Sequence, residues 1–128
     1  MTQPTPATQP TPAHDAKAQG VWAWILQRLS AVLLFVLLGT HLAVLHYVDE
    51  NLVINFAGVA ARMKSVLYLI VDGGLLSVGL YHALNGLRAV IFDFGFGESG
   101  RRAITYILLV VGVAFLLWGT YALAAFLK

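Results

Sequence analysis

Four polar side chains lie close together in the stretch "YHALNGLRAVIFDFG", residues 81–95, which is otherwise mostly apolar: His82, Asn85, Arg88 and Asp93. Such groups are costly in an apolar environment, so they are candidates for function. A neutral imidazole is a common axial ligand of haem iron. An arginine forms charge-assisted hydrogen bonds with carboxylates such as a haem propionate. These residue types therefore suggest a haem site.

His82 has a glycine before and after it on the same helix face, because Gly79 precedes it by three residues and Gly86 follows by four. Two glycines leave room for a flat group against the backbone. Arg88 lies six residues further along, which is about 9 Å of helix. A second interpretation is a histidine hydrogen-bonded across a helix interface, with Arg88 reaching lipid head groups. The spacing alone leaves both interpretations open.

Three further histidines lie outside this stretch. His41 follows Arg28 by thirteen residues, which is roughly 20 Å of helix. It would lie at a different depth from His82, so each of the two would need its second iron ligand from another chain. His46 lies near acidic residues and is interpreted as interfacial, and His14 as uninvolved.

Arg28 and Ser30 lie near the start of one apolar run, and Asp93 lies at the end of the next. Reduction of a quinone requires hydrogen-bond donors at its carbonyl oxygens and a supply of protons. Arg28 and Ser30 are candidate donors, and Asp93 is a candidate proton relay. The alternative is that Arg28 contacts phospholipid head groups and Asp93 caps a helix.

Asp72 is a further charged residue in an apolar run, and Arg62 or Lys64 is its candidate partner. No role follows for it from the sequence. The chain has no cysteine, no phosphate-binding glycine loop, no His–Glu–x–x–His motif and no hydrolase nucleophile elbow. Catalysis by this chain alone is therefore not expected.

The elements that must position these residues are apolar helices. Apolar residues make up 59% of the 128 residues and charged residues 11%, against about a quarter charged in soluble domains. The net charge of +2 is scattered, which argues against nucleic acid as a partner. Three apolar runs each exceed the roughly 20 residues that a helix needs to cross a bilayer. The sequence predicts an all-α membrane protein with transmembrane helices at about 22–48, 65–92 and 103–127.

The first twenty residues differ from the rest. "TQPTPA" occurs twice in tandem there, and all four prolines lie in this segment. Its composition predicts a disordered tail over 1–20, followed by one three-helix membrane domain over 21–128. The connection 49–64 is predicted as a mixed loop with room for a short surface helix, and 93–102 as a tight polar turn.

Basic residues predict the orientation in the membrane. They divide five to three between the two sides, which places the amino terminus and the second connection in the cytoplasm. The five are Lys17, Arg28, Arg88, Arg101 and Arg102, and the three are Arg62, Lys64 and Lys128. A stripe of small residues marks one side of the third helix, at Thr105, Gly112 and Gly119. Small residues allow close helix contact, either with a partner or with the chain's own helices.

Two fragments resemble a known family. "WILQRLSAVLLFVLLGTH" and "HALNGLRAVIFDFG" resemble the small cytochrome b membrane-anchor subunits of succinate dehydrogenase, also called succinate:quinone oxidoreductase. The first fragment is similar to the Arg-x-Ser opening of the family's helix one. The second is similar to its helix-two signature, here His82, Gly86, Leu87, Arg88, Asp93 and Phe94. The resemblance covers residues 22–127.

The resemblance implies half of a roughly six-helix bundle in a bacterial-type inner (cytoplasmic) membrane. Two anchors of this kind share haem b, with one axial histidine from each, and dock a flavoprotein and an iron–sulfur subunit. Electrons from succinate then reach quinone near the inner side. His82 matches the helix-two ligand, and His41 matches the helix-one ligand of variants with two haems. The other residues predicted for the haem pocket or its propionates are Arg88, Gly79, Gly86 and Arg28.

Some features leave the assignment open. Phe94 stands where the D-type anchor often has a tyrosine that helps hold the quinone. "HALNGLR" and the compact length favour the D type, whereas "FDFG" favours the C type. Alternative functions are an anchor of quinol:fumarate reductase, a cytochrome b subunit of another dehydrogenase, and a haem-free membrane scaffold or transporter subunit.

Overall fold

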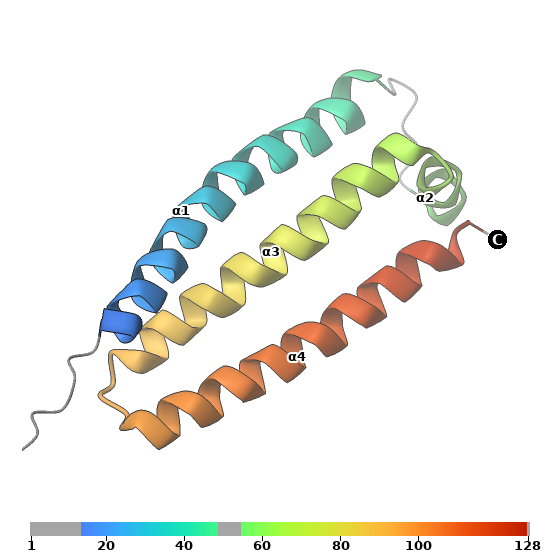
Figure 1. Cartoon of the computed structure of the whole chain (residues 1–128). Coiled ribbons are helices and arrows are strands. Elements are labelled where there is room, and N and C mark those ends of the chain that lie inside the picture. Colours follow the sequence, from blue (N-terminus) through green and yellow to red (C-terminus); the bar gives the residue numbers. More distant parts are fainter. Residues whose placement is uncertain (1–13, 49–54, 128) are drawn as a thin grey trace, which may run out of the picture.

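The computed structural model describes residues 14–48 and 55–127. These residues form helices joined by short turns, and no strand occurs among them. The helices are α1 (His14–Ala43), extended by one π-helical turn (Val44–Val48), α2 (Phe56–Met63), α3 (Val66–Phe92) and α4 (Glu98–Ala125) (Figure 1). The segments 20–47, 66–92 and 98–125 are long and apolar enough to cross a membrane. The predicted all-α membrane protein with three transmembrane helices is confirmed.

Two helices begin earlier than the sequence predicted. Helix α1 includes residues 14–20, which the sequence analysis assigned to the tail over 1–20, and residues 1–13 lie outside the described residues. This segment follows the last proline and is rich in alanine, which favours helix. Helix α4 begins at Glu98, before the predicted 103, because Gly97 serves as its N-cap and an acidic first turn suits the helix dipole.

The three long helices lie side by side in one layer with α3 in the middle. Helix α3 packs against α1 on one side and α4 on the other (Figure 1). The short α2 lies at one end of the layer, where the Phe56 ring is 6.0 Å from the Phe126 ring that follows α4. We call this the α2 end. The predicted short helix in the first connection is therefore present.

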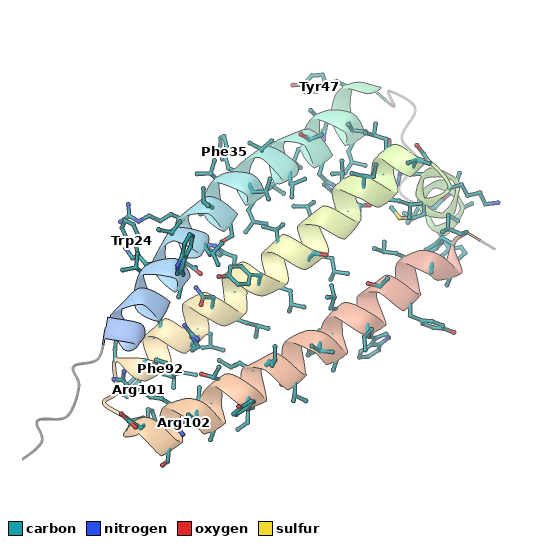
Figure 2. All side chains as sticks on the ribbon, in the orientation of Figure 1. Trp24, Phe35, Tyr47, Phe92, Arg101 and Arg102 are labelled. Atoms are coloured by element: carbon teal, nitrogen blue, oxygen red, sulfur yellow. The ribbon has the colours of Figure 1, made fainter. Side chains whose placement is uncertain are left out.

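A single layer leaves most side chains uncovered. Among the described residues only Ser30, Met63 and Val71 are buried. Large apolar side chains such as Phe35, 82% exposed, and Trp118, 70% exposed, face outward. Figure 2 shows Trp24, Phe35 and Tyr47 on the flank of α1 that points away from α3. Both faces of the layer therefore require lipid or another chain as a cover.

The small-residue stripe of α4 packs within the chain. A Cβ built on Gly112 would lie 2.7 Å from Leu84 Cδ1, and one on Gly119 would lie 2.6 Å from Leu76 Cδ2. Both leucines belong to α3. The stripe thus allows close approach of α3 and α4, which decides between the two alternatives in favour of the chain's own helices.

The opposite end of the layer carries several arginines and is called the arginine-rich end, defined by Arg88, Arg101 and Arg102. The guanidinium carbons of Arg88 and Arg101 lie 5.4 and 5.1 Å from the centre of the Phe92 ring. Figure 2 shows Phe92, Arg101 and Arg102 gathered there. The chain turns between α3 and α4 at Gly95, whose φ of 81° suits glycine.

Candidate histidine sites

His82 lies where α3 packs on α1. Its ring nitrogen Nδ1 is 3.0 Å from the hydroxyl oxygen of Ser30. The Ser30 hydroxyl also donates to the backbone carbonyl of Gln27, at 2.9 Å. Ser30 is only 5% exposed, so this contact is shielded from the surroundings.

Taken together, these two contacts favour one tautomer of His82. A carbonyl oxygen can only accept, so the single hydrogen of the Ser30 hydroxyl goes to the Gln27 carbonyl. The Ser30 oxygen can then only accept from the imidazole, which places the ring proton on Nδ1. In this tautomer the other ring nitrogen, Nε2, carries a lone pair, and the Gln27 amide nitrogen lies 3.3 Å from it. This tautomer is the form of histidine that binds a metal.

The side chain of Gln27 lies against the same ring. Its amide nitrogen is 3.3 Å from both Nδ1 and Nε2 of His82. The two nitrogens point in diverging directions, so one N–H cannot lie along both. We interpret this contact as packing against the ring. The same amide nitrogen donates to the His82 backbone carbonyl at 3.2 Å.

Asn85 completes the network. Its amide nitrogen donates to Gln27 Oε1 at 2.7 Å and to the Ala23 backbone carbonyl at 3.3 Å. Sequence reasoning gave no role to Gln27 or Asn85. The signal was available, because Gln27 precedes Ser30 by three residues and Asn85 follows His82 by three, and polar groups in facing helices usually pair.

Replacing Gln27 with leucine is expected to weaken the α1–α3 contact by about 1–3 kcal/mol, because it leaves the Asn85 amide and the His82 carbonyl without this partner. The measurement is the thermal midpoint of the purified complex in mild detergent. Leu26→Ala, a change of an exposed side chain one position away, serves as the control. Equal midpoints for Gln27→Leu and the native protein would contradict a stabilising network.

The glycines beside His82 make room for α1. A Cβ on Gly86 would lie 3.2 Å from the Gln27 amide nitrogen, and one on Gly79 would lie 3.7 Å from Leu34 Cδ2. Within the chain the space next to Gly86 is therefore taken by the Gln27 side chain. The role of the two glycines in a haem pocket stays a prediction.

The predicted arginines lie on other faces. Arg88 lines a groove of about 270 Å3 between α3 and α4, together with Asn85 and Thr105. Arg28 stacks on Trp24, with its guanidinium carbon 4.0 Å from the ring centre. Because Arg28 and Ser30 are two residues apart on a helix, their side chains diverge by about 200°. Arg28 thus points away from the Ser30–His82 contact.

Asp93 ends α3 as its C-cap, and its side chain is exposed at the arginine-rich end. The neighbouring Phe94 is 79% exposed. Both residues are therefore accessible to a partner or a ligand at this end of the layer.

His41 lies in the half of the layer nearer the α2 end and contacts Asp72. Its Nδ1 is 2.7 Å from Asp72 Oδ1, a contact that links α1 to α3. Among the described residues, His41 is a partner of Asp72, where the sequence had suggested Arg62 or Lys64. His46 lies in the π-helical turn, exposed, and its Nδ1 donates to the Leu42 carbonyl of its own helix at 3.0 Å.

The two histidine sites are similar in construction and separated in depth. In both, Nδ1 contacts an oxygen of the facing helix, Ser30 for His82 and Asp72 for His41. His41 follows Ser30 by eleven residues, which is about 16 Å of helix. The chain therefore presents two imidazoles at two levels, and each can offer Nε2 to a ligand.

Comparison with known proteins places the chain in a family. The family described as "Succinate dehydrogenase/Fumarate reductase transmembrane subunit" matches residues 5–121, nearly the whole chain. The succinate dehydrogenase 2 membrane subunit SdhC of Mycobacterium tuberculosis is 31% identical over 101 residues, which cover 77% of this chain and 70% of that protein.

Archaeal relatives are similar as well. The succinate dehydrogenase hydrophobic membrane anchor subunit of Halobacterium salinarum is 27% identical, over 72% of this chain and 71% of that protein. The corresponding subunit of Archaeoglobus fulgidus is 26% identical, over 79% of this chain and 86% of that protein. These relatives include a C-type subunit, so the resemblance to the D type stays a prediction. The match over nearly the whole sequence and the three spanning helices show that this chain belongs to the succinate dehydrogenase/fumarate reductase transmembrane subunit family.

Proposed function

We propose that this chain is one of two membrane anchors of a succinate dehydrogenase and that the pair holds haem b between them. The relatives described above are succinate dehydrogenase subunits, which favours this function over the fumarate reductase alternative. The observation that carries the haem proposal is the Ser30–His82 contact, which leaves Nε2 of His82 available as an iron ligand.

A second chain is part of the proposal for a physical reason. A haem of this type takes an axial ligand on each face, and His41 lies too far from His82 to supply the second one. A single layer of helices with both faces uncovered also suits a second anchor. Together the two chains would form the bundle of roughly six helices.

The residues have distinct roles in this proposal. Haem supplies a one-electron carrier. His82 is an axial ligand, and Ser30 holds its imidazole in the required tautomer through Nδ1. Gln27 and Asn85 fix the position of α1 against α3. Arg88 would pair with a propionate, and His41 is proposed as the ligand of a second haem.

The arginine-rich end is the proposed cytoplasmic side, where the flavoprotein and iron–sulfur subunits dock. The quinone candidates are Arg28 and Asp93, which are both exposed, and Ser30. The Ser30 hydrogen is already used by the Gln27 carbonyl, so this hydroxyl would have to release that bond before donating to a quinone.

The test is a reduced-minus-oxidised spectrum of the complex purified from its own membrane through a tag on this chain. Haem is quantified per anchor pair, and the co-purified subunits are identified. A b-type spectrum together with a flavoprotein and an iron–sulfur protein is expected. A complex that retains those subunits but contains no haem would refute the haem proposal and leave the chain as an anchor only.

A further inference from the structure

The contact between His41 and Asp72 is the shortest hydrogen bond made by a histidine ring among the described residues. It joins residues 31 positions apart, on α1 and α3, at 2.7 Å. The His41 side chain is 29% exposed and the Asp72 side chain 16% exposed. By contrast, the pair Arg102–Glu98 is 3.8 Å apart and almost fully exposed.

The chemistry of the two groups defines the direction of the bond. An ionised carboxylate can only accept, so the imidazole donates through its Nδ1 proton. The second ring nitrogen of His41 is thereby held on the opposite side of the ring from Asp72. The ring is fixed in both orientation and tautomer, as in the carboxylate–histidine pairs that support metal ligands.

A carboxylate in a membrane-spanning helix is unfavourable unless a partner or a function compensates for it. Asp72 lies within α3, six residues after its first residue. Polar groups at such positions are costly and usually pair with one another or serve a function. Helix packing alone does not need a charge, because Leu37 of α1 already packs closely on Gly74 of α3, where an added Cβ would lie 3.3 Å from Leu37 Cδ2.

We propose that Asp72 is a positioning residue that orients His41 and strengthens it as a ligand. The inference rests on the proposed function, in which His41 binds the iron of a second haem. A hydrogen bond to a carboxylate makes the imidazole a better electron donor and so favours ferric over ferrous iron. His82 differs in this respect, because its Nδ1 contacts a neutral hydroxyl.

The decisive variant is Asp72→Asn, which keeps the shape and an acceptor oxygen but removes the charge. The complex is purified from its own membrane, and each haem is followed by redox titration and by the electron paramagnetic resonance of its ferric state. We expect both haems to remain, and the one bound by His41 to become easier to reduce. The ferric-to-ferrous ratio at a given potential should fall at least tenfold, which is about 59 mV for one electron. The other haem should not change.

Three further variants complete the test. His41→Ala should lose one haem, and Asp72→Leu should lose or loosen that same haem. Thr40→Val is the control, because the Thr40 hydroxyl donates to the Val36 carbonyl of its own helix at 2.8 Å. If His41→Ala loses a haem while Asp72→Asn changes neither potential nor resonance, Asp72 only joins the helices and the inference is wrong. If His41→Ala keeps every haem, the proposed role of His41 fails, and the inference fails with it.

Discussion

A complex carrying His82→Ala is expected to lose one haem b per anchor pair. Nδ1 of His82 lies 3.0 Å from the Ser30 hydroxyl oxygen, so Nε2 is the ring nitrogen proposed to bind iron, and the Gln27 amide nitrogen, 3.3 Å from Nε2, would have to move aside. Removing the imidazole would remove the proposed axial bond, and no neighbouring side chain could replace it, because Gln27, Ser30 and Asn85 are poor ligands for haem iron. The measurement is haem per anchor pair by the pyridine haemochrome method.

Loss of haem in an alanine variant can also follow from disturbed packing, so a matched variant is needed. His82→Asn keeps a nitrogen near the position of Nδ1 and can still donate to Ser30, but it has no counterpart of Nε2. It should lose haem as completely as His82→Ala while the subunits stay together. His46→Ala, which changes an exposed histidine bonded to its own helix, should keep all haem. Full haem content in His82→Asn would refute the assignment of this ligand.

Gly119→Val is expected to give the largest loss of stability among changes in α4. The first added carbon would lie 2.6 Å from Leu76 Cδ2 and 3.0 Å from Leu76 Cδ1, so the whole end of that leucine has to move. Overpacking of this kind costs about 1–3 kcal/mol. The expected result is a lower thermal midpoint of the purified complex. Gly112→Ala should have a smaller effect. The added methyl group would contact a single carbon, Leu84 Cδ1, at 2.7 Å.

The control for this prediction is Gly39→Val. It makes the same change in another spanning helix, at a position where an added Cβ would have no neighbour within 4 Å among the residues that the structure describes. The comparison separates a steric effect between α3 and α4 from the general effect of valine in a helix. An unchanged midpoint for Gly119→Val would mean that α3 and α4 separate easily and that the close contact adds little to stability.

The sequence contained enough information to find the elements and the histidines, but less to find their partners. Length and hydropathy predicted three helices because these are properties of each segment by itself. Ser30 was predicted as a quinone donor, which stays a prediction, and its contact with His82 was not foreseen. Gln27, Asn85 and Asp72 had no role, although each is a polar group in a spanning helix and makes a contact with the facing helix.

The partners were harder to predict than the helices because a spanning helix needs apolar side chains toward lipid as well as toward its neighbours. In a soluble helix, the alternation of polar and apolar residues indicates which side faces the core. In α1, α3 and α4 the sides facing lipid and the sides facing other helices are both largely apolar, so hydrophobic periodicity is a weak guide to direction. The sequence by itself determined that the chain lies in lipid, that it has three spanning helices, and which family it belongs to. The tertiary structure decided that His82 faces Ser30, that His41 faces Asp72 and that the glycines of α4 face α3, because these pairings depend on how the helices are rotated against one another.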